Sequence, residues 1–453
     1  MAVDRSRLPV PGRTPSFTFP AIQRSTLDSG LRVWSLRHVS IPVATVMLLI
    51  RRGAGDDPIG REGLAAITAD MLDEGTGTLS SIDVHEALAR IGAQLDTDIG
   101  PDATLLTLTV VSRFLRPAVS MLASMVVRPS LREDDFARVR QLRLHRLMQL
   151  RDMPGAVADR AFMKLIYGPH PYGHTPLGGE ASLSSLSIDD VRSFHANQLR
   201  PSDATLVVAG DCTHEDVAAV AAEAFGDWTG IAAPAVTAGS TLPVPPRLNL
   251  ISRPGAPQSE LRMGHVAVAR STPDYHALVS ANMVLGGQFV SRINTNLRED
   301  KGFTYGARTS FDFRRLPGPF MLQVSVQTAA TAEAIRESML EIAGIRDGRP
   351  VSVDELSLGV AALTRGYARN FETAEQLARA ATQLALYELP DTYFDEFVER
   401  VERVTVDDVT RVTQQYLDPS HLTTLVVGDY GVIAKDLPGL DLGTPSIMAP
   451  DTF

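Results

Sequence analysis

One stretch of the sequence decides the fold and carries its most informative chemistry: residues 285–306 read LGGQFVSRINTNLREDKGFTYG. Two adjacent glycines open it and permit a tight backbone turn. Val290, Ile293 and Leu297 follow at helical spacing, so they predict a short helix with one apolar face. Apolar and polar residues then alternate, which predicts a half-buried strand that contains Tyr305. The stretch therefore predicts a turn, a helix and a strand in succession.

A cation and a phenol fall close together in this arrangement. Arg298 lies near the end of the predicted helix and Tyr305 on the strand after it, with one tight turn between them. A guanidinium and a phenol hydroxyl that point to one place can hold a carbonyl oxygen or a developing oxyanion. The alternative interpretation is that Arg298 is a solvated helix charge and Tyr305 a packed strand aromatic.

The stretch closely resembles the C-terminal signature of the M16 (pitrilysin-type) zinc peptidases. That signature is Leu-Gly-Gly-Gly, then Ser-Arg-Leu, then Leu-Arg-Glu-x-Lys-Gly-Leu-x-Tyr, and this chain departs from it at Gln288, Ile293 and Phe303. In the family, the Arg and Tyr of the signature reach into the zinc site and hold the substrate. The resemblance therefore implies a substrate-binding, transition-state-stabilising role for Arg298 and Tyr305.

The family's metal-binding motif is degenerate in this chain. Its frame is recognisable in residues 63–76, which read GLAAITADMLDEGT. A zinc site of the family's His-x-x-Glu-His type needs two imidazoles one helical turn apart and a carboxylate that activates water. The imidazole positions hold Ala66 and Asp70, the carboxylate position holds Ala69, and no Glu stands near His145, where the third ligand is expected. We therefore expect no metal in this chain.

No other catalytic pattern replaces the missing one. His170 and His174 lie in the segment Tyr-Gly-Pro-His-Pro-Tyr-Gly-His, which we interpret as a turn because active family members have a similar segment that binds no metal. The single cysteine, Cys212, excludes an intrachain disulfide. Nucleophile-elbow, P-loop and dinucleotide-binding glycine patterns are absent from the sequence.

Composition and charge narrow the possible partners. The chain has 453 residues and a net charge of −10, from 43 basic and 53 acidic side chains. An acidic balance argues against nucleic acid and against an anionic membrane surface. No apolar run approaches the roughly 20 residues that span a membrane, and the start has no apolar signal core. These features predict a cytoplasmic protein, or a periplasmic one if a signal peptide has been removed.

A long repeat predicts two homologous domains. Residues 189–211 and 407–429 end in the same way, and Pro201 and Pro419 stand 218 positions apart. A repeat of this length is a domain duplication, and its mixture of strands and helices predicts two α+β domains with helices on mainly antiparallel sheets. The predicted parts are a lead-in (1–22), a first domain (23–226), a proline-rich linker (227–247), a second domain (248–435) and a tail (436–453).

The resemblance also implies a division of labour. In the M16B branch of the family, one chain carries His-x-x-Glu-His and another carries the Arg/Tyr pair, and the two form a clamshell. This chain looks like the second kind: a non-metal, peptide-binding subunit, inactive alone, whose heterodimer partner holds Zn²⁺. A homodimer is the alternative assembly when that partner is absent, and the sequence does not decide whether it forms. The alternatives are an inert scaffold, as in the M16-like core proteins of respiratory complexes, and a solitary peptide-binding protein.

Overall fold

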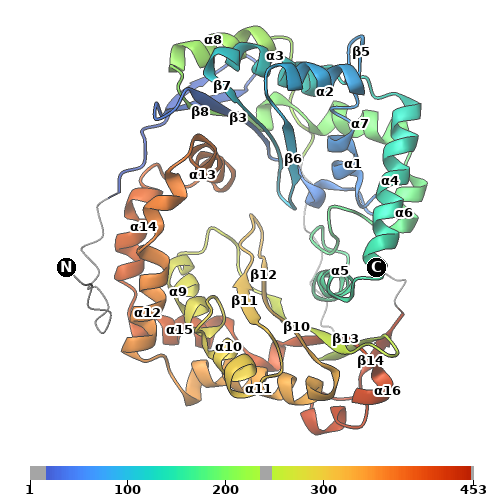
Figure 1. Cartoon of the computed structure of the whole chain (residues 1–453), viewed down its shortest axis with the longest axis vertical. Helices are drawn as coiled ribbons and strands as arrows, with labels where there is room; N and C mark the ends of the chain where they lie inside the picture. The colour runs from blue at the N-terminus through green and yellow to red at the C-terminus, as the bar shows by residue number, and fades with distance from the viewer. Residues whose placement is uncertain (1–16, 235–246, 450–453) are drawn as a thin grey trace, which may run out of the picture.

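The protein consists of two halves, each built on a six-stranded mixed sheet with helices packed on it (Figure 1). The computed structural model describes residues 17–234 and 247–449. Residues 235–246 of the predicted linker, 1–16 of the lead-in and 450–453 of the tail lie outside this description. Most neighbouring strands in both sheets are antiparallel, so the predicted α+β class is confirmed.

The first sheet has the strand order β1-β2-β8-β3-β7-β6. Its central strand β3 is almost wholly apolar, and successive side chains point to opposite faces. Val46 and Leu48 face one core, whereas Met47 and Leu49 face another. Both faces of this sheet are therefore buried. The strands are β1 (Gln23–Thr26), β2 (Arg32–Arg37), β3 (Val43–Ile50), β6 (Leu95–Ile99), β7 (Thr104–Val111) and β8 (Ala204–Gly210).

The second sheet, β11-β12-β10-β13-β9-β14, repeats the first. Its five strands from β9 to β13 follow the order of β2-β8-β3-β7-β6 when read from the other edge, which is the structural form of the 218-residue repeat. The sixth strand, β14, falls in the residues predicted as a tail and pairs with β9. The strands are β9 (Leu248–Ser252), β10 (Gln258–Val266), β11 (Ala307–Phe311), β12 (Pro319–Gln327), β13 (Thr423–Gly428) and β14 (Ser446–Met448).

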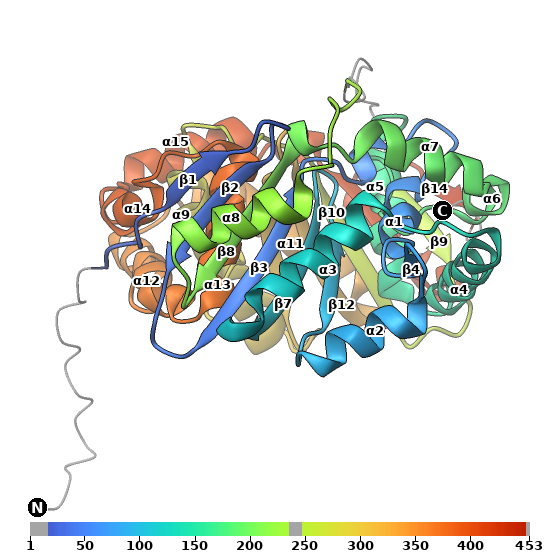
Figure 2. The same ribbon diagram turned by 90° about the horizontal axis from the view of Figure 1, so that it is seen from above.

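Residues 17–234 contain eight α-helices, and α3 and α8 cross the outer face of the first sheet (Figure 2). They are α1 (Leu64–Asp70), α2 (Ser81–Arg90), α3 (Leu115–Val127), α4 (Glu133–Arg151), α5 (Pro154–Tyr167), α6 (Glu180–Ser185), α7 (Ile188–Gln198) and α8 (His214–Phe225). The second half contributes α9 (Tyr275–Leu285), α10 (Arg292–Asn294), α11 (Thr331–Ala343), α12 (Val353–Thr364), α13 (Ala374–Tyr387), α14 (Tyr393–Glu402), α15 (Val406–Tyr416) and α16 (Tyr430–Ile433). Within the described residues, no helix is both long and apolar enough to cross a membrane.

The two halves exchange helices. Helix α13 of the second half packs on β3 and β8 of the first sheet, and α5 of the first half packs on β10 and β13 of the second (Figure 1). Leu377 and Leu384 of α13 share a core with Trp34 of β2, and Phe162 of α5 shares one with Leu425 of β13. The predicted boundary near residue 227 therefore separates the two sheets along the chain, but two of the hydrophobic cores contain residues from both sides of it.

The lead-in is also tied to the second half. Phe19 lies 4.9 Å from Phe394, centroid to centroid, and its backbone N–H donates to Asp395 at 2.5 Å. Phe17 stacks on Phe371 at 4.6 Å. Residues 17–22 were predicted as part of a loose segment, because a short run rich in proline and arginine gives no sign of its distant partners. Aromatic packing orders this part of the predicted lead-in.

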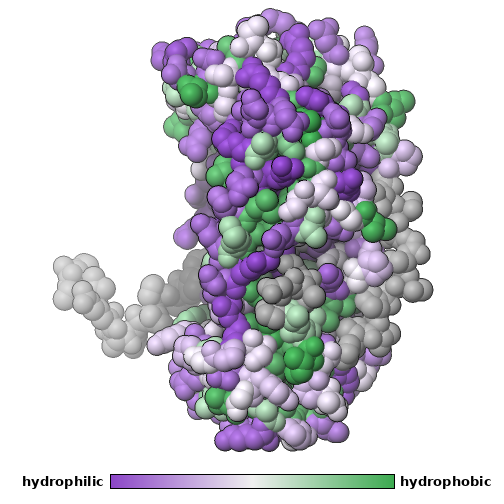
Figure 3. All heavy atoms as spheres, turned by 90° about the vertical axis from the view of Figure 1, so that its right-hand side faces the viewer, coloured by the Kyte–Doolittle hydropathy of each residue, from purple (hydrophilic) through white to green (hydrophobic). Residues whose placement is uncertain are grey.

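The face that carries α4 and α6 is mostly hydrophilic, with hydrophobic side chains in separate small groups (Figure 3). Leu142 and Met148 of α4 are among the exposed apolar residues. Isolated apolar residues of this kind are normal on a protein surface. The visible part of this face therefore offers no single large apolar area for docking.

Candidate functional site

The glycine turn and the helix of residues 285–306 form largely as predicted. Ile293 and Leu297 are buried, the helix runs through α10 into a π-helical turn (Thr295–Asp300), and Gly302 follows it with a φ of +65°. A Cβ on Gly286 would lie only 2.5 Å from the hydroxyl of Thr309 in β11, so a glycine is required there. Val290 lies before the helix and is exposed, contrary to the prediction of a three-residue apolar face.

The predicted strand begins later than expected. Strand β11 starts at Ala307, and residues 303–306 form a bend. The hydroxyl of Thr304 accepts from Gly306 N–H at 3.1 Å and donates to its carbonyl at 3.0 Å, and such local hydrogen bonds compete with a sheet ladder. Tyr305 therefore stands in a loop with 95% of its surface exposed. The prediction that it lies on the strand is wrong by two residues.

Arg298 is held close to the protein surface by its neighbours. Its guanidinium carbon lies 3.3 Å from the ring centroid of Phe289, and the guanidinium donates to the carboxylate of Glu299. The Arg298 side chain is only 14% exposed, whereas Phe289 is 68% exposed. The packed guanidinium is thus not the freely solvated charge that the alternative interpretation required.

Arg298 and Tyr305 belong to one short segment but do not touch. No hydrogen bond or ring contact joins them in the part of the chain that the structure describes. Arg298 packs on Phe289, and the phenol of Tyr305 extends into solvent. Their convergence on one substrate oxygen therefore stays a prediction, and it requires the loop that carries Tyr305 to move or a substrate to bridge the two groups.

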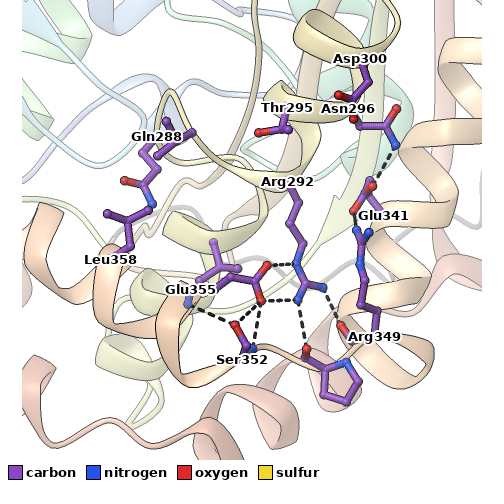
Figure 4. A pocket seen from close by; sticks show the side chains of 13 residues that line it. Gln288, Arg292, Thr295, Asn296, Asp300, Glu341, Arg349, Ser352, Glu355 and Leu358 are labelled. Atoms are coloured by element: carbon purple, nitrogen blue, oxygen red, sulfur yellow. Dashed lines mark hydrogen bonds and ion pairs between the residues drawn. The ribbon is translucent and has the colours of Figure 1, made fainter.

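A pocket of about 440 Å³ lies beside the same helix (Figure 4). Its most prominent feature is Arg292, which donates to both carboxylate oxygens of Glu355 at 2.7 and 2.8 Å and to the carbonyls of Arg349 and Pro350 at 2.6 and 3.0 Å. These hydrogen bonds with Arg292 lower the pKa of Glu355 to about 2. Each nitrogen of the guanidinium therefore donates at least one hydrogen bond, and Arg292 anchors the helix of Arg298 to α12.

The degenerate metal motif is folded as a helix but offers no metal ligands. Ala66 and Ala69 are buried in α1. Asp70, at the end of that helix, forms an ion pair with Arg143 of α4, and burial raises the pKa of the Asp70 carboxyl. Two methyl groups and a carboxylate already paired with a guanidinium do not fit zinc. Among residues 17–234 and 247–449, no group of three or more His, Cys, Asp or Glu side chains is arranged to hold a metal ion.

Asp57 holds the start of helix α1, a role that the sequence did not reveal. Its carboxylate accepts from the backbone N–H groups of Gly63 and Ala65, both at 2.7 Å, and from Nε2 of His174 at 3.0 Å. The Asp57 side chain is fully buried. His170 accepts from Tyr172 N–H at 3.0 Å within its own loop. Both histidines thus have the packing and turn roles that the sequence predicted.

Comparisons with known proteins agree with this fold. The model of the family described as insulinase (peptidase family M16) matches residues 32–177, and the model described as peptidase M16 inactive domain matches residues 185–363. An uncharacterized zinc protease of Mycobacterium tuberculosis is 24% identical over 429 residues, which is 93% of this chain and 97% of that protein.

Two solved structures have the same fold. The peptidase M16 inactive domain from Pseudomonas fluorescens superposes with a TM-score of 0.82 at 22% identity, and the alignment covers 90% of this chain and 98% of that one. A protease from Helicobacter pylori also gives 0.82, at 19% identity, with coverages of 90% and 99%. The two family models together match well over half of the sequence. The chain therefore belongs to peptidase family M16.

Proposed function

We propose that this chain is the non-metal subunit of a heterodimeric M16 zinc peptidase, and that it supplies Arg298 and Tyr305 to a site whose zinc is bound by its partner. The observation that carries the proposal is an asymmetry between the halves. The metal positions of the first half hold Ala66, Ala69 and an ion-paired Asp70. The second half keeps the Arg/Tyr signature on a tightly anchored helix.

The chemistry of the pair supports transition-state stabilisation. When an activated water attacks a peptide carbonyl, negative charge develops on the carbonyl oxygen. A guanidinium and a phenol hydroxyl are donors that stabilise such a charge, and donors fixed in advance do so most strongly. Arg292 and Glu355 fix the helix of Arg298, so this donor is preorganised. Tyr305 is 95% exposed, so its hydroxyl is accessible to a bound peptide. The partner supplies the zinc and the general base.

A test requires the full chain and a His-x-x-Glu-His homologue encoded beside it. We expect peptide hydrolysis by the mixture and none by this chain alone. Arg298→Ala should lower kcat/KM of the mixture about 10²-fold or more, because one oxyanion donor is lost. Arg365→Ala, the same exchange at an exposed position after α12, is the matched control and should leave kcat/KM unchanged. An active mixture with unaltered kcat/KM for Arg298→Ala would refute the role of the pair.

The second candidate is a peptide-binding or scaffold protein without a catalytic role. It is favoured by the contact of Arg298 with Phe289 rather than with Tyr305. In that case the chain binds its homologue, or forms a homodimer, without any gain in hydrolysis. Analytical ultracentrifugation of the mixture, combined with the activity assay, separates the two candidates.

A further inference from the structure

The loop between β11 and β12 (residues 312–318) is bound by side chains of the first half. Asp102, in the turn between β6 and β7, accepts from Arg315 N–H at 2.8 Å. The hydroxyl of Tyr172 accepts from Leu316 N–H at 3.2 Å and itself donates to Asp102. Tyr167, at the end of α5, donates to the carbonyl of Pro317 at 2.8 Å. We call Asp102, Tyr167 and Tyr172 the hairpin clamp.

The hairpin clamp is buried, and its polar groups are committed to this one loop. All three side chains belong to residues less than a tenth exposed. Burial raises the pKa of both phenols, which keeps their hydroxyl protons in place. Arg314 stacks 4.9 Å from the ring of Tyr172 and pairs with Asp312, so the loop also contacts the clamp through its own side chains. Buried polar groups that are satisfied in this way fix one arrangement of a segment.

The bound loop is continuous with the Arg298/Tyr305 segment. Strand β11 pairs with β12 along its whole length and begins two residues after Tyr305. Its first residue, Ala307, donates to the side chain of Asn294 at 2.8 Å, and Asn294 belongs to α10, on the helix that carries Arg298. Thr309 N–H donates to Gly286 at 3.1 Å. A short, hydrogen-bonded path therefore runs from the clamp to both signature residues.

We infer that Asp102, Tyr167 and Tyr172 are positioning residues for Arg298 and Tyr305. The inference rests on the proposed function. The first half of the chain lacks the family's metal ligands but has a role under this inference. Its buried polar groups hold the β11–β12 hairpin, and Tyr305 lies immediately before that hairpin. The halves are thus coupled by a polar contact as well as by the exchanged helices.

The first test measures order in the isolated chain by hydrogen–deuterium exchange. Tyr172→Phe removes one hydroxyl and keeps the ring. We expect faster exchange by about five- to tenfold at residues 307–316, since a buried hydrogen bond is lost. Tyr367→Phe is the matched control: its buried hydroxyl donates to the carbonyl of Phe394 at 3.1 Å, away from the hairpin. Faster exchange confined to residues 312–318, or the same change in the control, would overturn the inference.

The second test uses the complex with the His-x-x-Glu-His homologue. Tyr172→Phe should lower kcat about five- to tenfold with KM little changed, because the effect acts on donor position and not on peptide contact. In a Tyr305→Phe background the same exchange should have little further effect, since residues that act through one another are not additive. Full additivity would overturn the inference. A complex inactive in every form, together with the expected exchange pattern, would instead refute the proposed function.

Discussion

Because each half packs a helix on the sheet of the other half, we predict the stability cost of truncating Leu384. This residue of α13 belongs to the second half of the sequence, yet it is 1% exposed in a core shared with Leu36, Met47 and Val207 of the first sheet. Leu384→Ala removes a fully buried isobutyl group and leaves a cavity. Such changes cost about 2–5 kcal/mol, a large share of the roughly 5–15 kcal/mol that stabilises a typical domain.

Intrinsic fluorescence during urea unfolding provides the assay. The chain has two tryptophans, both in the first half of the sequence: Trp228 lies in the core of that half, and Trp34 of β2 lies in the core shared with α13. The signal therefore reports unfolding of the first half, and Leu384→Ala should move its midpoint to lower urea although the altered residue lies beyond position 247. Leu358→Ala is the matched control, because this leucine of α12 is half exposed. Its cost should stay below about 0.5 kcal/mol.

The result that refutes the reasoning is a tryptophan transition unchanged by Leu384→Ala. That outcome would mean that the first half is stable without α13, as a division of the chain at residue 227 implies. Leu278→Ala, in a core formed by the second half alone, extends the test. If it shifts the tryptophan transition as well, the two halves unfold as one cooperative unit.

Two further predictions concern buried or paired carboxylates that anchor helices: Asp57 at the start of α1, and Glu355, which binds the helix of Arg298 through Arg292. Asp57→Asn should destabilise the chain by about 2–4 kcal/mol, because Gly63 and Ala65 donate to different oxygens of the carboxylate and the amide replaces one of these oxygens by an NH2 donor. Thermal unfolding measures this loss, and an equal effect of Asp28→Asn, at an exposed position, would contradict the assignment. The low pKa of Glu355, about 2, means that its pairing with Arg292 adds stability above the ordinary carboxyl pKa of about 4.3 and loses it as pH falls toward 2. The difference in unfolding midpoint between the wild type and Glu355→Gln should therefore narrow between pH 5 and pH 2.5, and a constant difference would contradict the assignment.

The sequence predicted the repeated part of the fold well. The common endings around Pro201 and Pro419 identified a duplication, and the two sheets have the same strand order apart from their outer strands. However, a local apolar pattern predicts that a side chain is buried and does not identify the sheet against which it packs. The sequence pattern around Leu384 therefore predicts a core residue of the second half, whereas this side chain packs against the first sheet. Strand β14 is three residues long, too short for its alternation to be recognised.

The candidate site was predicted only where the signal is local. The helix that carries Arg298 has its own periodicity and its own glycine stop, so it was found. The bend at Tyr305 depends on one threonine hydroxyl that competes with the strand ladder. Asp57 and the hairpin clamp bind partners 6 to 213 positions away in the sequence, and residue spacing alone cannot reveal such contacts. An isolated Asp or Tyr carries no pattern, and only the three-dimensional arrangement gave these residues a role.

The ring of Phe289 covers the guanidinium of Arg298 at the position where a ligand of that guanidinium would otherwise bind. A cation–π contact at an exposed site contributes about 0.5–1 kcal/mol, and a surface ion pair such as that with Glu299 contributes little more. If Arg298 binds a substrate carbonyl as proposed, displacement of the Phe289 ring should therefore lower the affinity for that carbonyl only about two- to fivefold. The contact with Phe289 also restricts the long side chain of Arg298 to one conformation, so less conformational entropy is lost when a ligand binds. In the proposed function, Phe289 therefore holds the Arg298 guanidinium in one place through a contact weak enough for a substrate to displace.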